Sequence, residues 1–234
     1  MNLYTLKSVT KKYGVGDGLV IALDDVSTTI ESGKFVVILG ASGSGKSTLL
    51  NILGGIDHPS SGEILYQEEN IAYLNNRKLT AFRQKNIGFI FQHYNLLNNL
   101  TALENIEFSC EISGQNKKLA KDALERVGLD QRGGHYPSEL SGGEQQRISI
   151  ARAIVKKPSV LLCDEPTGAL DLKTGVSILE TLRNVNKDDG STVIVVTHNK
   201  DVARIADIVI TMRDGQIISK DQIYNPVLPQ DVEW

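Results

Sequence analysis

The segment Gly40-Ala41-Ser42-Gly43-Ser44-Gly45-Lys46-Ser47 constrains the fold of this chain more than any other feature. It fits the pattern GxxxxGK[ST] and lies between an apolar run, Phe35–Leu39, and a helix-like segment, Ser47–Gly54. Glycines let such a loop curl until its backbone N–H groups point inward, and the following helix N-terminus adds a favourable dipole for an anion. This order of elements therefore predicts a polyphosphate-binding site on an α/β layer.

The residue types in this loop suit a nucleoside triphosphate. We expect Lys46 to bridge the β- and γ-phosphates and the Ser47 hydroxyl to reach Mg²⁺. The predicted nucleotide contacts are Gly40, Ser42, Gly43, Ser44, Gly45, Lys46, Ser47 and Thr48. The pattern indicates an NTPase and by itself leaves the class of NTPase open.

The guanine-reading pattern NKxD of GTPases also occurs, at Asn186-Lys187-Asp188-Asp189. It follows a helix-like stretch, Val176–Val185, whereas a guanine-reading loop should follow a strand. We therefore interpret the run as a solvated loop at a helix end, which argues against a GTPase.

Strand-like and helix-like segments alternate along the chain, which favours an α/β layer with parallel strands. Two further apolar runs end in polar pairs, Asp164-Glu165 and Thr197-His198. Antiparallel strands are predicted near Leu3–Thr10, Asp25–Ile30 and Gly62–Tyr66.

Residues 98–153 instead show helical periodicity, as in Lys117–Val127, and few β-branched runs. This predicts a helical subdomain inserted into a single domain of residues 1–220. The tail, 221–234, holds two prolines and ends in Trp234; we expect it to be extended, and no function can be assigned to it.

The charge balance gives no indication of a nucleic-acid partner, because 25 basic and 28 acidic side chains leave a net charge of −3. The longest apolar runs are strand-length, and the N-terminus lacks a charged segment followed by an apolar one, so we expect neither a membrane span nor a signal peptide. Cys110 and Cys163 lack metal-ligand spacing and are interpreted as reduced thiols of a cytoplasmic protein. Membrane association is therefore expected only through a partner.

A second glycine-rich loop, Leu140-Ser141-Gly142-Gly143-Glu144-Gln145-Gln146-Arg147, opens a helix-like segment. Its small residues, Ser141, Gly142 and Gly143, make another backbone surface suited to phosphate. One nucleotide does not need two such loops from one molecule, so the simplest explanation is a head-to-tail homodimer in which each loop closes on the γ-phosphate held by the other subunit. The alternative is an ordinary helix cap by Ser141. The run resembles the signature motif of the ABC (ATP-binding cassette) family and departs from its commonest form only at Glu144.

Further motifs fall in the order that this family requires, from about Tyr4 to Gly215. Tyr13 resembles the aromatic residue that stacks on adenine. Gln92 resembles the glutamine that touches Mg²⁺ and the attacking water, and Asp171 belongs to a run similar to the loop that spans the dimer.

The acidic pair and the histidine complete the resemblance. Asp164 resembles the aspartate that holds Mg²⁺, Glu165 the general base, and His198 the histidine that contacts the γ-phosphate. The resemblance implies an active ATPase that uses ATP and Mg²⁺. It also implies a P-loop NTPase (RecA-like) core with an N-terminal antiparallel β subdomain and an inserted α-helical subdomain.

Two runs, Phe89–Leu97 and Leu100–Asn105, closely resemble one branch of the family. That branch contains macrolide and antimicrobial-peptide exporters, lipoprotein-release ATPases and the cell-division ATPase. The resemblance implies a position at the cytoplasmic face of the membrane beside a permease subunit with few transmembrane helices and a large outer domain. His93–Leu97 lies where such ATPases receive the coupling helix of the permease. Envelope remodelling, a non-transport ABC protein of translation or DNA repair, and a P-loop kinase stay open as alternatives.

Overall fold

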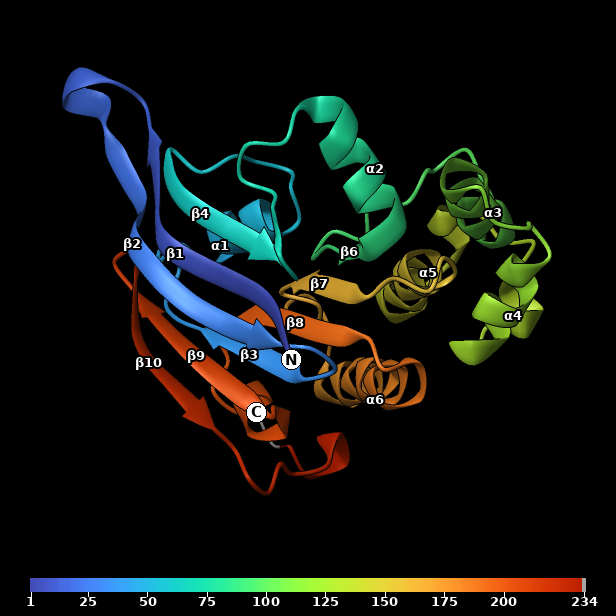
Figure 1. Cartoon of the computed structure of the whole chain (residues 1–234). Helices are drawn as coiled ribbons and strands as arrows, with labels where there is room; N and C mark the ends of the chain where they lie inside the picture. The colour runs from blue at the N-terminus through green and yellow to red at the C-terminus, as the bar shows by residue number, and fades with distance from the viewer. Residues whose placement is uncertain (233–234) are drawn as a thin grey trace.

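Two β-sheets organise residues 1–232, the part of the chain that the computed structural model describes (Figure 1). The antiparallel sheet has the order β2 (Val20–Glu31), β1 (Asn2–Tyr13), β4 (Ser61–Tyr66) and β5 (Glu69–Asn70). The central sheet has the order β10 (Gln216–Gln222), β9 (Ile208–Arg213), β3 (Phe35–Leu39), β8 (Thr192–Thr197), β7 (Val160–Asp164) and β6 (Ile87–Ile90). Its strands are parallel from β9 to β6, and β10 pairs antiparallel at the edge.

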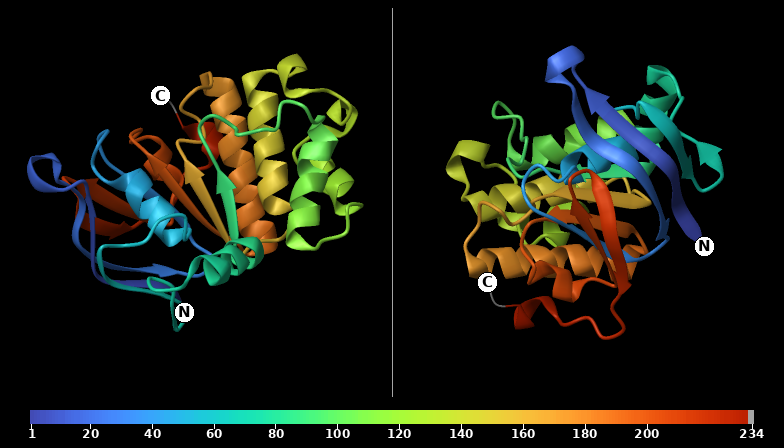
Figure 2. Two further views of the ribbon diagram at one scale, coloured as in Figure 1. Left: turned by 90° about the horizontal axis from the view of Figure 1, so that it is seen from above. Right: turned by 90° about the vertical axis from the view of Figure 1, so that its left-hand side faces the viewer.

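The helices cover the two faces of the central sheet unequally. They are α1 (Lys46–Leu53), α2 (Asn76–Asn86), α3 (Ala102–Ser113), α4 (Leu119–Arg126), α5 (Gly142–Ile154) and α6 (Leu172–Asp189). Short 3₁₀ turns are η1 (Gly16–Gly18), η2 (Asp130–Arg132), η3 (Pro137–Glu139), η4 (Val202–Ile205) and η5 (Pro229–Asp231). Figure 2 shows α3, α4 and α5 gathered on the side away from the β1–β2 hairpin.

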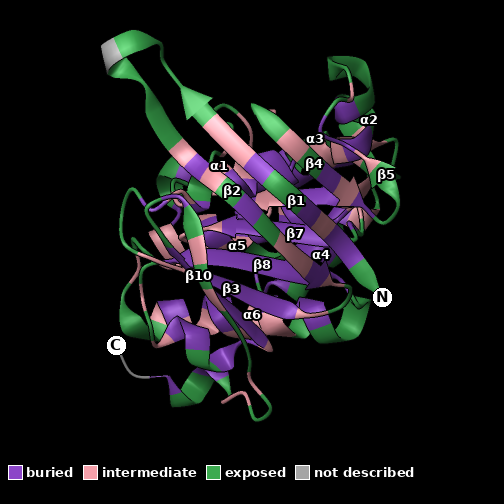
Figure 3. Ribbon diagram, turned by 60° about the vertical axis from the view of Figure 1, so that its left-hand side comes forward, coloured by how far each residue is buried: buried purple, intermediate pink, exposed green. Residues whose placement is uncertain are grey.

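Alternate side chains of β3 divide the core into two layers. Val36 and Ile38 belong to the cluster formed with α1 and the antiparallel sheet. Phe35 and Val37 belong to the cluster formed with α3 to α6. A strand buried on both faces needs an uninterrupted apolar run, which is why this segment does not alternate with polar residues. Figure 3 shows the same burial along β3, β7 and β8.

The helical region follows the predicted periodicity. The pattern at Lys117–Val127 forms α4, which buries Ala120, Ala123 and Leu124 against its neighbours. A capping box at Thr101 starts α3, and Gly114 in the left-handed conformation (φ 69°) ends it. The boundaries 98–153 and 1–220 stay predictions.

The interpretation of Asn186–Asp189 as a solvated loop at a helix end is correct for the exposure of Lys187, Asp188 and Asp189, but wrong for the loop and for Asn186. These residues form the last turn of α6, and Asn186 is buried. Its side-chain amide donates to the carbonyls of Gly33 and Ser191 at 3.0 and 2.8 Å. A buried amide that satisfies backbone carbonyls serves the fold, so the resemblance to a guanine-reading motif has no functional counterpart.

The tail is not simply extended. After β10 the backbone N–H groups of Ile223 and Val227 donate to the carbonyls of Asp207 and Arg204 at 2.9 and 3.1 Å. The chain then enters η5, where Pro229 and Val232 are buried. Apolar contacts therefore hold the tail on the body, a result that its prolines alone did not predict. Residues 233–234, with Trp234, lie outside the described part.

Candidate nucleotide site

The phosphate loop closes between β3 and α1. Gly45 has φ 97°, and a Cβ added there would lie 2.4 Å from the carbonyl oxygen of Ala22, so only glycine fits. Lys46 is 6% exposed, and its Nζ donates to the carbonyls of Gly40 and Ala41 at 2.8 Å each. The ammonium group is therefore held at the loop by the loop itself.

The start of α1 meets the end of β7. Ser47 Oγ donates to Asp164 Oδ1 at 3.0 Å across 117 positions of sequence. Burial raises the pKa of the Asp164 carboxyl, the neighbouring charge of Glu165 adds to this, and Ser47 and Lys46 oppose it. Two oxygen groups in this position suit a hard cation such as Mg²⁺.

The next residue, Glu165, has a left-handed backbone with φ 46°. This conformation costs a non-glycine residue about 1–3 kcal/mol, and strained residues of this kind cluster at active sites. It lets Glu165 Oε1 accept from the His198 backbone N–H at 3.1 Å and lie 2.9 Å from the same residue's Nδ1. The ends of β7 and β8 thus place a carboxylate against an imidazole.

These groups line one cleft of about 700 Å³, a volume that suits a nucleotide. Gln92, which follows β6, reaches the same cleft. The lining residues are Val20, Ile21, Ala22, Ala41, Ser42, Gly43, Gly45, Lys46, Ser47, Thr48, Gln92, Asp164, Glu165 and His198. Most of the predicted site residues therefore meet in space, although they come from four separate segments of sequence.

In residues 1–232, no three His, Cys, Asp or Glu side chains gather as a metal cluster. Mg²⁺ usually keeps several waters and phosphate oxygens and takes only one or two protein carboxylates. The Ser47 and Asp164 pair therefore fits a nucleotide-bound Mg²⁺ better than a resident metal.

Tyr13 stands outside the lining set, at the end of β1 opposite Val20. Its hydroxyl donates to Asp57 Oδ2 at 2.7 Å, and Lys11 Nζ lies 4.7 Å from the ring centroid. Lys11 also pairs with Asp57 Oδ1 at 2.6 Å. Burial and the bond to Asp57 raise the pKa of the Tyr13 hydroxyl, while Thr48 opposes them. Sequence reasoning missed the roles of Lys11 and Asp57 because nothing local links these two residues.

The second glycine-rich loop does not reach the cleft. Ser141 caps α5 by accepting the Glu144 N–H, and Glu144 in turn caps Ser141. A Cβ at Gly142 would lie 2.7 Å from the Tyr94 hydroxyl, and one at Gly143 would lie 2.3 Å from Thr174. Ser141, Gly142 and Gly143 are thus apart from the phosphate loop of their own chain.

Asp171 is also absent from the cleft lining. Its carboxylate caps α6 by accepting the Thr174 N–H at 3.1 Å and the Thr174 hydroxyl at 2.6 Å. A partner would have to bring these two segments to a nucleotide.

A family model described as ABC transporter matches residues 23–168, more than half of the chain. The chain belongs to the ABC transporter family. The family resemblance is therefore confirmed, and the chain is an ABC ATPase, as its motifs predicted.

A solved dimer of the ATP-binding cassette MJ0796 in a post-hydrolysis state, bound to ADP and Pi, has a TM-score of 0.88 and 41% identity. The match covers 95% of this chain and 99% of that chain. The predicted ABC ATPase fold is thus confirmed, with a nucleotide-binding core, an antiparallel sheet and a helical region.

Curated relatives include the ABC transporter ATP-binding protein MJ0796 of Methanocaldococcus jannaschii, 44% identical over 93% of this chain and 96% of its own length. The macrolide export ATP-binding/permease protein MacB of Burkholderia thailandensis is 48% identical over 92% of this chain. The corresponding MacB of Chlorobaculum tepidum is 44% identical over 95%. This chain spans about a third of the length of these MacB proteins (34% and 35%).

Within residues 1–232, no helix combines the length and apolarity needed to cross a bilayer.

Proposed function

We propose that this ABC ATPase closes as a homodimer around two Mg-ATP and drives a membrane permease that exports macrolides or antimicrobial peptides. The observation that carries the ATPase mechanism is the pairing of Glu165 with His198 beside the contact of Ser47 with Asp164. Both pairs line one nucleotide-sized cleft.

Glu165 is placed to act as the general base. His198 occupies Oε1 with two contacts, which fixes the carboxylate and leaves Oε2 for a water molecule. A positioned carboxylate can take a proton from that water as it attacks the γ-phosphorus in line. Gln92, at the mouth of the same cleft, orients the water in this proposal.

Lys46 and the loop N–H groups stabilise the charge that develops on the transferring phosphoryl group. Such fixed donors need no reorganisation during the reaction, and this electrostatic contribution is usually the largest in phosphoryl transfer. Tyr13 stacks on adenine at the rim. Ser47 and Asp164, with Gln92 in the same cleft, would hold Mg²⁺, whose charge would offset that of the phosphates.

The proposed dimer rests on two segments that do not line the cleft, the second glycine-rich loop and Asp171. Gly142 and Gly143 offer helix N-terminal N–H groups, and Ser141 a hydroxyl, at a place that does not line the cleft of their own chain. A second copy arranged head to tail would bring this loop, with Asp171, onto the γ-phosphate. The similar MJ0796 cassette has been solved as a dimer, which supports a dimer for this chain.

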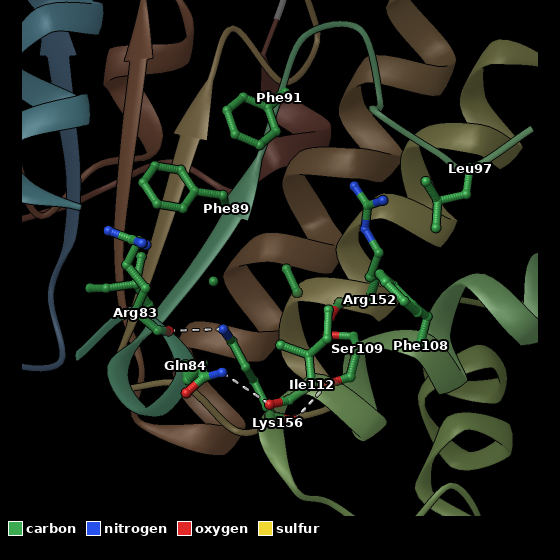
Figure 4. Close-up of a pocket in the computed structure, with 14 residues that line it drawn as sticks. Arg83, Gln84, Phe89, Phe91, Leu97, Phe108, Ser109, Ile112, Arg152 and Lys156 are labelled. Carbon is green, nitrogen blue, oxygen red and sulfur yellow. Dashed lines mark hydrogen bonds between the residues drawn. The ribbon is translucent and has the colours of Figure 1, made fainter. Parts of the chain in front are cut away.

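The permease is proposed to dock in a groove of about 310 Å³ between β6, α2, α3 and α5 (Figure 4). Phe89 and Phe91 stack on one side, with ring centroids 5.4 Å apart. Phe108 and Ile112 project from α3 on the other side and are 44% and 51% exposed. An apolar surface of this kind is a liability unless a partner covers it.

Three cations also line this groove: Arg83, Arg152 and Lys156. Each donates to backbone carbonyls, and none has a carboxylate partner among residues 1–232. Burial, helped by the charge of Arg83, lowers the pKa of Lys156 to about 8. This groove includes Leu97 of the stretch His93–Leu97, and we assign it to the coupling helix of a permease with a large outer domain. The ATPase then lies at the cytoplasmic face of the plasma membrane.

The proposed cargo rests on the 44% and 48% sequence identity to two MacB proteins over 95% and 92% of this chain. An envelope-remodelling role, in lipoprotein release or cell division, is the second candidate, because the same branch of the family contains such ATPases. A non-transport ABC protein is the third candidate, and no long coiled-coil insertion, which one group of such proteins carries, interrupts residues 1–232.

The test uses Glu165→Gln. We expect ATP turnover to fall at least about a hundredfold, the usual scale for a lost general base, while ATP still binds. Glu180→Gln, at a half-buried position of α6 that does not line the cleft, is the matched control and should leave turnover unchanged. Near-normal turnover in Glu165→Gln contradicts the mechanism.

The same variant identifies the partner. Tagged Glu165→Gln trapped with ATP in native cells should co-purify from solubilised membranes with a stoichiometric integral membrane protein that carries a large outer domain. Recovery of ribosomes, of DNA-repair proteins or of the soluble dimer alone contradicts the transporter assignment.

A further inference from the structure

Glu144, the one departure from the commonest signature sequence, carries charge at a sensitive place. Its Oε2 accepts the Ser141 N–H at 2.9 Å and the Ser141 hydroxyl at 2.8 Å. These two bonds from Ser141, with Arg132 nearby, hold the pKa of the Glu144 carboxyl below its ordinary value. The group is therefore a carboxylate at neutral pH, directly behind the loop that is proposed to receive the γ-phosphate.

This arrangement opposes phosphate binding in two ways. The single proton of the Ser141 hydroxyl points to Glu144 and is not free for a phosphate oxygen. The ionised carboxylate also repels an incoming polyanion, and such repulsion is strong when water is excluded from a closing interface. A glutamine in this position would cap Ser141 without adding negative charge.

Arg132 offsets the charge of Glu144 and gives this carboxylate a partner other than Ser141. Its Nε lies 3.0 Å from Glu144 Oε1, the oxygen that Ser141 does not use, and the two side chains are 48% and 24% exposed. Arg132 comes from η2, outside the glycine-rich loop and outside the nucleotide cleft. The guanidinium neutralises the carboxylate and still holds it after the Ser141 hydroxyl turns away.

We propose that Arg132 is a positioning residue for cross-dimer closure: it holds and neutralises Glu144 so that the Ser141 loop can accept the γ-phosphate of the other copy. On closure the Ser141 hydroxyl keeps its proton and donates its hydrogen bond to a phosphate oxygen in place of Glu144 Oε2. Glu144 keeps the Ser141 N–H and Arg132 as partners. No covalent bond changes. This inference rests on the dimer of the proposed function.

The experiment measures ATP-dependent dimerisation by sedimentation, with Glu165→Gln as the parent so that the dimer is not consumed. Arg132→Gln should raise the dimer dissociation constant about a hundredfold, because the dimer contains two such loops and each loses about tenfold, or about 1.4 kcal/mol. Fluorescent ATP binding to the separate chain should change less than about twofold, since Arg132 does not line the cleft.

Three variants separate this role from ordinary folding support. Glu144→Gln should abolish the effect of Arg132→Gln, so that the double variant dimerises within about threefold of Glu144→Gln alone. Arg132→Lys should restore dimerisation to within about threefold of the parent. Arg126→Gln removes a comparable ion pair, with Asp189 at 2.9 Å, and should leave dimerisation unchanged.

Two results overturn the inference: Arg132→Gln dimerises like the parent, or it loses as much affinity in the Glu144→Gln background as in the native one. Both require a parent that dimerises with ATP. A parent that stays monomeric contradicts the proposed dimer itself, so the two failures are distinguishable.

Discussion

Replacing Tyr13 with alanine should weaken ATP binding through the base alone. Tyr13 is 41% exposed, and Lys11 and Asp57 contact its ring and hydroxyl and hold the side chain in place. Stacking of a base on an aromatic side chain contributes about 1–3 kcal/mol by alanine substitution. Because the ring is already ordered, binding avoids most of the about 0.5–1.5 kcal/mol needed to immobilise a side chain.

We therefore expect a loss of about 2 kcal/mol, or about 30-fold in the dissociation constant of ATP. Calorimetric titration in the Glu165→Gln background measures this without hydrolysis. Inorganic tripolyphosphate, which has no base, is the internal control and should bind Tyr13→Ala as it binds the parent.

Tyr13→Phe keeps the ring and loses the bond to Asp57, so it should cost only about threefold, the scale of one modest hydrogen bond. The reasoning is refuted when Tyr13→Ala binds ATP within about twofold of the parent, or when tripolyphosphate loses as much affinity as ATP.

Two predictions concern stability. Asp207 accepts from the Phe35 N–H at 2.7 Å and from Arg183 at 2.7 and 3.1 Å; burial raises its pKa, but these donors outweigh burial and lower it. The stabilisation by ionised Asp207 is therefore present above the unfolded pKa of about 3.9 and is lost as the pH falls through the lower folded pKa. At pH 7, Asp207→Asn should be about 1–3 kcal/mol less stable than the native protein in urea unfolding. On acidification the native protein should lose more free energy of unfolding than Asp207→Asn does. Lys156 gives a rise in the same direction at alkaline pH: its pKa is lowered, chiefly by burial, from 10.5 to about 8, so the unfolded chain holds the extra proton and the free energy of unfolding should rise between pH 8 and 10.5. Urea unfolding of Lys156→Met should lack this rise, and an equal rise in both proteins contradicts the assignment of a buried cation.

The sequence predicts those parts of the site that depend on a local motif or on the ends of parallel strands. The phosphate loop needs Gly45 next to Lys46, and parallel strands bring Asp164 and His198 to one sheet edge, so both could be inferred from pattern and topology. The contacts that orient these groups join distant positions. Tyr13 meets Asp57 across 44 residues, and no periodicity encodes that distance.

Asn186 shows the converse error. A polar run at a helix end usually faces solvent, but its position beside β3 and β8 left two backbone carbonyls to satisfy. The burial of Asn186 depends on how α6 packs beside β3 and β8, and this packing cannot be predicted from composition. Arg132 was missed for a similar reason, because its proposed role depends on an ion pair with Glu144, which lies on another helix.

The helix α1 has a mechanical consequence. It begins at Lys46 in the phosphate loop and is followed by Gly54, where an added Cβ would lie 2.0 Å from the Phe89 ring of the groove. Eight residues of α-helix span only about 12 Å. The phosphate loop and the groove therefore contact opposite ends of one short helix. Because no loop lies between these two ends, a tilt of α1 should move both of them together.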